Sequence, residues 1–268
     1  MKPPKLTDRL DYSDVIIIPF SGGYDSTLIL LSECERLTKY NDKEPWIILE
    51  YFDDCIIKED KRNIEKGRAI LVVNKIKELF PDLNIKLDIV TFRQDFNFHY
   101  NNRRHFKQVA PQSTSWMGIL HRILSTTVNV ERLEVLLGLN YSDGSTYTAK
   151  KIKEDLEFWY YKTKEPENEF DVEFNVAFPL AFEDKATILK YILVKYPEVY
   201  DLIWYCEEPV LDMPCGRCKK CVEINNALRK LELEIDESIS YYTETESIKR
   251  KLKDFYTSDK NEHLSNQE

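Results

Sequence analysis

The stretch Phe20-Ser21-Gly22-Gly23-Tyr24-Asp25-Ser26-Thr27 follows a β-branched run, Val15-Ile16-Ile17-Ile18, and precedes an apolar helical pattern, Leu28-Ile29-Leu30-Leu31. A strand, a glycine turn and a helix N-terminus in this order are typical of an α/β sheet. Two glycines permit positive φ and close backbone approach. The turn therefore aims several backbone N–H groups and the positive end of a helix dipole at one point, which predicts a phosphate-binding loop.

The side chains of this loop extend the prediction. Ser21 and Ser26 carry hydroxyl donors for phosphate oxygens, whereas Asp25 would repel phosphate and suits a magnesium ligand or an N-terminal helix cap. A plain glycine turn with a serine cap is the structural alternative. The pattern GxxxxGK[ST] does not occur, which argues against a Walker-type kinase or GTPase. The expected nucleotide-binding residues are Ser21, Gly22, Gly23, Tyr24, Asp25, Ser26 and Thr27.

Four cysteines near the C-terminal end form a second motif: Cys206, Cys215, Cys218 and Cys221. Cysteines separated by two residues place both sulfurs on one metal, and four thiolates suit tetrahedral zinc with no open position. The sequence thus predicts a structural zinc site. An iron–sulfur cluster is an alternative for the same ligands, and a disulfide pair is a second one.

The loop resembles the SGGxDS signature of the PP-loop ATP pyrophosphatases, and the loop together with the cysteines resembles 7-cyano-7-deazaguanine synthase. Three further stretches agree with that family: Gly138–Asp143, Phe178–Leu180 with Lys185–Ile188, and Trp204–Cys206. The resemblance covers roughly residues 12 to 232. It implies a doubly wound, mostly parallel five-stranded α/β sheet with a small C-terminal zinc-binding helical element.

The resemblance also implies a reaction. Members of the family adenylate a 7-deazaguanine carboxylate with ATP, form an amide with ammonia, activate it again and dehydrate it to a nitrile. In this chain Asp25 would position Mg²⁺, and Asp143 would bind substrate or Mg²⁺ unless it is only a turn residue. Lys185 would reach the phosphates unless it is a surface lysine at a helix start. The implied cofactors are ATP, Mg²⁺ and structural Zn²⁺.

Departures from the family pattern leave the acceptor open. The family has a Gln and a His after its second strand, where this chain reads Tyr51-Phe52-Asp53-Asp54; Ser113–Gly118 and Thr148–Lys150 also differ. One alternative is a relative in an antiviral defence system that modifies a protein or a nucleic acid. A tRNA-modifying thiolase would need a cysteine pair at the active edge. Cys55 sits there alone, and Cys34 lies in an apolar helix and is expected in the core.

Bulk properties narrow the class of protein. The chain has 268 residues, 43% hydrophobic content and a net charge of −9, which predicts a folded domain that does not bind duplex nucleic acid through its whole surface. The basic, aromatic stretch from Arg93 to Lys107 is expected to be a solvated loop. A charged N-terminus without a signal peptide predicts a cytoplasmic protein without membrane contact. The expected partners are ATP, a 7-deazapurine carboxylate and an amine donor; a homodimer remains open.

Periodicity places the elements. We expect a PP-loop domain over 1–200, a zinc element over 201–235 and a charged tail over 236–268. Strands are predicted at 15–19, 46–51, 85–90, 133–139 and 176–178. Helices are predicted at 25–40, 64–80, 115–129, 152–161, 185–195 and 222–231. The Ser21 loop, Tyr51–Cys55, the Phe92 loop and Asn140–Asp143 should meet at the carboxyl edge of the sheet.

Overall fold

The computed structural model describes residues 9–39, 45–54, 59–92, 130–139, 150, 152–158, 172–210 and 213–231. Within these residues the chain forms one five-stranded sheet in the order β3-β2-β1-β4-β5, with every neighbouring pair parallel. The strands are β1 (Val15–Pro19), β2 (Trp46–Asp54), β3 (Asn84–Phe92), β4 (Arg132–Leu136) and β5 (Glu173–Ala177). The predicted α/β class and parallel five-stranded sheet are confirmed.

The central strand β1 is apolar on both faces because both faces of the sheet are covered. Ile16 and Ile18 belong to one buried cluster, whereas Val15 and Ile17 belong to a second cluster on the opposite face. This alternation follows from the two-residue period of a strand. Two hydrophobic layers therefore sandwich the sheet, as a doubly wound fold requires.

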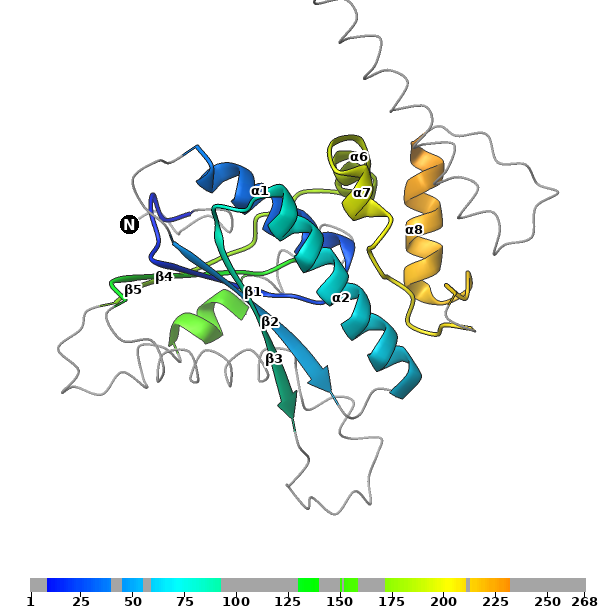
Figure 1. Ribbon diagram of the computed structural model, residues 1–268, viewed down its shortest axis with the longest axis horizontal. Coiled ribbons are helices and arrows are strands. Elements are labelled where there is room, and N and C mark those ends of the chain that lie inside the picture. The colour runs from blue at the N-terminus through cyan, green and yellow to red at the C-terminus, as the bar shows by residue number, and fades with distance from the viewer. Residues whose placement is uncertain are drawn as a thin grey trace, which may run out of the picture.

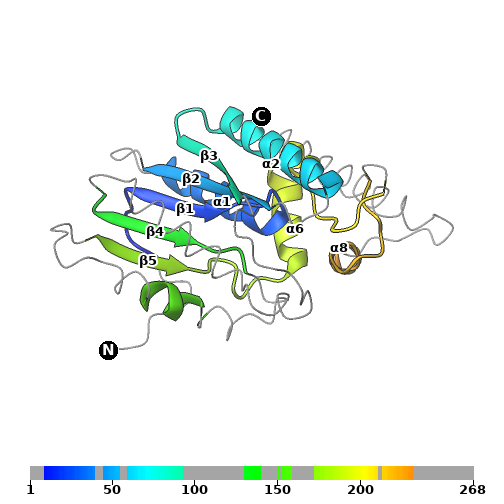
Figure 2. The same cartoon turned by 90° about the horizontal axis from the view of Figure 1, so that it is seen from below.

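Among the described residues, more helices cover one face of the sheet than the other. The larger cluster packs against α1 (Tyr24–Leu37), α2 (Glu59–Leu79) and α6 (Lys185–Lys195). Leu156, within the helical residues 152–158, belongs to the other cluster. Figure 1 shows α1 and α2 on one side of the sheet and this short helix on the other, and Figure 2 gives the same arrangement from below.

The cysteine-containing segment is attached to the main core. It comprises α7 (Pro197–Tyr200), a turn with the cysteines, and α8 (Lys219–Lys230). Ile224, Ala227 and Leu228 of α8 share the core cluster of α1 and α6. The limits of the three predicted units stay a prediction, but α8 buries its apolar side against the sheet domain.

Several element boundaries differ from the predictions for local reasons. Helix α1 begins at Tyr24 with Gly23 as its N-cap, so the interpretation of Asp25 as the cap is wrong. Helix α8 begins at Lys219 because the Cys218 side chain caps it. Strand β4 ends at Leu136, so residues 137–139 leave the sheet and are free to line a site. The sequence patterns missed α7, which starts with a proline at its N-terminal turn.

Other predictions stand close to the structure. Helix α6 and strand β1 have the predicted bounds. The Asp184 side chain caps α6 and accepts a hydrogen bond from the Thr187 backbone N–H at 2.8 Å. Helix α2 starts five residues earlier than expected. The loop after Phe92, the helix predicted at 115–129 and the charged tail predicted over 236–268 lie outside the described residues. No helix among the described residues is long and apolar enough to cross a membrane.

Candidate nucleotide site and metal centre

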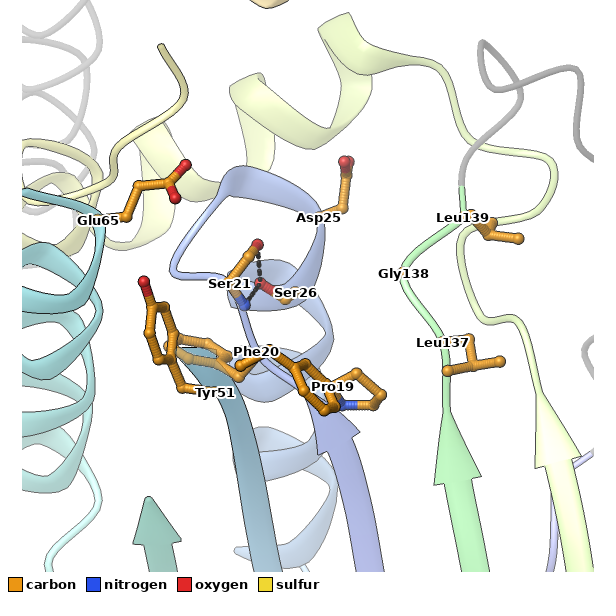
Figure 3. A pocket seen from close by; sticks show the side chains of 11 residues that line it. Pro19, Phe20, Ser21, Asp25, Ser26, Tyr51, Glu65, Leu137, Gly138 and Leu139 are labelled. Atoms are coloured by element: carbon orange, nitrogen blue, oxygen red, sulfur yellow. Dashed lines mark hydrogen bonds between the residues drawn. The ribbon is translucent and has the colours of Figure 1, made fainter. Parts of the chain in front are cut away.

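A pocket opens where the direction of strand order reverses. Strand β1 has β2 on one side and β4 on the other, and ligands of open α/β sheets bind at the carboxyl ends of the strands at such a switch point. The pocket has a volume of about 350 Å³. Its lining, drawn in Figure 3, comes from the end of β1 and the loop after it, from β2, α1 and α2, and from the chain that leaves β4: Pro19, Phe20, Ser21, Asp25, Ser26, Tyr51, Phe52, Glu65, Leu137, Gly138 and Leu139.

The predicted phosphate loop lies at the centre of this pocket. The Ser21 and Ser26 hydroxyl oxygens lie 3.3 Å apart, and the Ser26 hydroxyl donates to the Gly23 carbonyl at 3.3 Å. The Ser21 hydroxyl accepts from the Gly23 N–H at 3.3 Å. These bonds are at the long end of the usual range, so phosphate oxygens can replace them at small cost. The loop closes on its own serines, and Ser21 and Ser26 line the pocket.

Two glycines allow the neighbouring elements to approach the loop closely. Gly22 has φ of 72°, and a methyl group there would lie 2.9 Å from the Cα of Ala69 in α2. A methyl group on Gly138 would lie 3.3 Å from the Cβ of Asp25. Gly22 has no room for a side chain and Gly138 has little, so the loop is packed closely between α2 and the chain leaving β4.

Lys185 reaches the loop from a distant part of the sequence. Its ammonium group donates to both carboxylate oxygens of Asp25, at 2.6 and 2.7 Å. The Lys185 side chain is only 8% exposed, so its interpretation as a surface lysine is wrong. The Asp25 side chain is 21% exposed and lines the pocket, so a cation bound to phosphate oxygens there could also bind its carboxylate. The geometry brings a cation and an anion together beside the phosphate loop.

Glu65 is a pocket residue that the sequence patterns missed. Figure 3 shows Glu65 and Tyr51 on one side of the loop and Leu137–Leu139 on the other. Burial raises the pKa of Glu65, nearby Lys61 lowers it, and Glu207 raises it further. Lys61 and Glu65 are four residues apart with a nitrogen–oxygen distance of 3.6 Å, and such a pair in a helix ordinarily indicates an exposed face. No motif marked Glu65, whereas Tyr51 could be expected from its place at the end of a strand.

The four predicted metal ligands converge. The sulfur atoms of Cys206, Cys215, Cys218 and Cys221 all lie within 4.8 Å of one another, and all four residues are buried. They are free thiols, which removes the disulfide interpretation. Gly216, between two of them, has φ of 72° and permits the tight turn. Four convergent thiols match the ligand set of a closed tetrahedral site, for zinc or for an iron–sulfur cluster.

Backbone N–H groups support the sulfur atoms. The Cys215 N–H donates to the Cys206 sulfur at 3.1 Å, and the Cys218 N–H donates to the Cys215 sulfur at 3.2 Å. Burial raises the pKa of Cys206 to about 11 and also raises that of Cys221. Burial also opposes ionisation of Cys218, but hydrogen bonds from the backbone of Cys221 and Glu207 lower its pKa overall. A bound cation would supply the charge that thiolates at such a buried place need.

Of the remaining candidates, Cys34 is described, whereas Asp143, Cys55 and Asn140 lie outside the described residues. Cys34 is fully buried in α1, as expected of a core residue, and burial raises the pKa of its thiol. Of the four segments expected at the carboxyl edge, two line the pocket, the loop after Ser21 and the end of β2; the described residues Gly138 and Leu139 lead into a third.

Comparisons with known proteins add little. No model of a known protein family matches the sequence, and no curated protein matches it. Among solved structures, the chain is similar to the U34-tRNA thiolase NcsA from Methanococcus maripaludis, described with its [4Fe-4S] cluster. The identity is 18%, the TM-score is 0.43, and the match covers 91% of this chain and 72% of that one. A likeness this weak leaves the fold and the site to rest on the sheet, the loop and the cysteines themselves.

Proposed function

We propose that this chain is an ATP-using enzyme of the PP-loop type that activates a carboxylate as its adenylate and joins it to an amine. The observation that carries the proposal is the Ser21–Ser26 loop, clamped at the switch point of the sheet with Asp25 and Lys185 beside it. Backbone N–H groups, hydroxyls and a lysine gathered at one helix N-terminus favour bound phosphates.

Each residue of the loop has a role in the proposed step. Ser21, Ser26 and the backbone N–H groups of residues 22–24 would hold the β- and γ-phosphates of ATP. A substrate carboxylate oxygen attacks the α-phosphorus, the bond from that phosphorus to the bridging oxygen breaks, and pyrophosphate leaves with its electron pair. Lys185 would keep Asp25 oriented and offset negative charge as the leaving group departs. Asp25 would hold Mg²⁺, which neutralises phosphate charge when bound.

The second half-reaction uses the activated carboxyl group. The nitrogen of an amine attacks the acyl carbon, AMP leaves, and the nitrogen loses a proton. A repeated activation of the resulting amide would lead to a nitrile. Water must be excluded so that the adenylate is not hydrolysed before the amine attacks. The apolar side chains of Phe20, Phe52 and Leu137, which line the pocket, favour this exclusion.

The substrate we propose is a 7-deazaguanine carboxylate. Aromatic side chains of Phe20, Tyr51 and Phe52 line the pocket and suit a planar heterocycle. Glu65 adds a hydrogen-bond acceptor for the N–H edge of such a ring. This assignment rests on the resemblance of the motifs as well as on the pocket.

A different acceptor is the second candidate, and one observation favours it. The chain has Phe52-Asp53-Asp54 at the end of β2, where the resembled family has a Gln and a His. Tyr51 and Phe52 at this end of β2 line the pocket, so the change adjoins residues that would contact the acceptor. A protein or nucleic-acid acceptor, as in an antiviral defence system, would keep the same activation chemistry. A tRNA-modifying enzyme of the PP-loop type is a weaker form of this alternative.

The four cysteines would hold a structural Zn²⁺, because a site with four buried sulfur ligands leaves no position for substrate. An iron–sulfur cluster could use the same four cysteine ligands, and its visible absorption would distinguish it from zinc.

Mass spectrometry tests the reaction. The full chain is incubated with ATP, Mg²⁺, ammonium and 7-carboxy-7-deazaguanine, and the products are AMP and an amide or nitrile base if the proposal holds. Asp25→Ala serves as the inactive control and must stay folded by circular dichroism. AMP without a changed base moves the acceptor to a macromolecule. Failure to form AMP with any carboxylate would contradict the activation chemistry itself.

A further inference from the structure

The segment that leads into the cysteine site packs directly on the phosphate loop. Tyr24, the residue after the loop glycines, is only 2% exposed. Its ring centroid lies 5.5 Å from that of Tyr200 and 5.8 Å from that of Tyr205. Tyr205 immediately precedes the first cysteine of the cluster. Two aromatic rings from this segment therefore cover the start of α1.

The backbone of the same segment contacts the loop glycine. A methyl group on Gly23 would lie 3.7 Å from the carbonyl oxygen of Trp204. The Trp204 indole N–H donates to the Cys206 carbonyl at 3.0 Å, and the Arg68 guanidinium lies 6.0 Å from the centre of the indole ring. Trp204 is thus held between a cysteine ligand and α2 while its own carbonyl faces the loop.

The cysteine site is continuous with this segment. Cys206 is fully buried, and its sulfur atom accepts the Cys215 N–H and converges with the three other sulfurs. A metal ion bound by the four cysteines would join residues 204–206 to the N-terminus of α8 by bonds much stronger than one N–H···S contact. Trp204 and Tyr205 would then be fixed against Gly23 and Tyr24.

We propose that the four-cysteine element positions the phosphate loop through Trp204 and Tyr205, so that filling the cysteine site sets the affinity of the loop for pyrophosphate. The inference rests on the proposed function, since it takes the loop to bind phosphates. An N–H cradle that is already oriented loses less conformational entropy on binding than a loose one. Loss of the metal, or of the Tyr205 ring, therefore weakens pyrophosphate binding without removing any group that touches the ligand.

Calorimetric titration of the full chain with magnesium pyrophosphate tests the proposal. Tyr205→Ala removes the ring, Tyr205→Phe retains it, and Tyr191→Ala is the matched control, since Tyr191 lies on α6 and donates to Glu35 rather than facing the loop. We expect Tyr205→Ala to keep the wild-type metal content and to raise Kd about tenfold, which is about 1.4 kcal/mol. Tyr205→Phe and Tyr191→Ala should stay within about twofold of the wild type.

Metal removal gives the second measurement. Chelation of the wild type should raise Kd by a similar factor, and chelation of Tyr205→Ala should add little, because both changes act through one contact. If chelation unfolds the chain by circular dichroism, the two Tyr205 variants decide the question alone. Wild-type affinity in metal-loaded Tyr205→Ala would overturn the positioning role. A wild type that binds no pyrophosphate would instead overturn the proposed function and with it the basis of this inference.

Discussion

Lys185 donates to both carboxylate oxygens of Asp25, at 2.6 and 2.7 Å, although the two residues are 160 positions apart in the sequence. The pair joins the start of α6 to the first turn of α1. Hydrogen bonds between charged groups are stronger than neutral ones, and a mostly buried lysine needs such a partner. The contact therefore fixes the orientation of the carboxylate beside the phosphate loop.

Lys185→Met keeps most of the side-chain volume and removes the charge. We expect ATP-dependent AMP release to fall about a hundredfold or more, because Asp25 loses its ammonium partner and the leaving group loses a nearby cation. The free energy of unfolding should fall by about 2 kcal/mol. Lys190→Met, an exposed position on the same helix, is the control and should leave both quantities near wild type. Unchanged AMP release in Lys185→Met would remove the lysine from the mechanism.

Alanine substitutions at two nearby glycines should change the free energy of unfolding in opposite directions. Gly22→Ala combines a left-handed φ of 72° with a methyl group 2.9 Å from the Ala69 backbone, so it should lower the free energy of unfolding. We expect a loss of about 2–4 kcal/mol. Gly67→Ala lies on the exposed side of α2 with nothing within 4 Å of the added carbon. It should stabilise the helix by about 0.5–1 kcal/mol.

Chemical denaturation of the two variants measures both effects. An unchanged midpoint for Gly22→Ala would mean that the loop does not hold the backbone conformation seen between α2 and the chain leaving β4.

The metal content of cysteine variants tests which cysteines are metal ligands. Cys218→Ser should lose the metal and lower the free energy of unfolding by about 3 kcal/mol or more, since a site with three sulfur ligands holds zinc poorly. Cys34→Ala, at a buried position in α1 away from the cluster, should retain it. Elemental analysis gives the metal content, and the visible spectrum separates zinc, which is colourless, from an iron–sulfur cluster. Full metal occupancy in Cys218→Ser would contradict the ligand assignment.

Glu65 should make the chain less stable as the pH rises. Burial raises its pKa above the ordinary 4.5, so the folded state binds the proton more tightly than the unfolded state. The contribution of this group to the free energy of unfolding is therefore largest at pH values below its pKa in the unfolded state. It falls as the pH rises through its pKa in the folded state. Glu65→Gln should melt like the wild type near about pH 4 and at a higher temperature near about pH 7.

Glu78→Gln, at an exposed position near the end of the same helix, is the matched control for replacing a carboxylate by an amide. If Glu65→Gln destabilises the chain at neutral pH, the carboxylate is held by favourable interactions that outweigh its burial. A stabilised variant that also binds substrate poorly would indicate that the buried carboxylate is kept for recognition.

Local patterns in the sequence were sufficient for much of the fold. The run at 15–18 followed by two glycines predicted β1, the turn and α1, because strand, turn and helix preferences act over a few neighbouring residues. The spacing of the last three cysteines predicted their convergence for the same reason, since short separations leave few geometries. The alternation of predicted strands and helices placed the expected site at the carboxyl edge of a parallel sheet, where the pocket lies.

The contacts that shape the site were decided by tertiary structure. Three contacts join elements that are far apart in the sequence and that no local preference relates. They are the contacts of Lys185 with Asp25, of Trp204 with Gly23 and of Ala69 with Gly22. Glu65 lies four residues from Lys61, a spacing typical of an exposed helical ion pair, and only the packing of α2 places it at the pocket. The physical reason is that sequence periodicity reports which face of an element is apolar, whereas packing of several elements determines which polar groups meet.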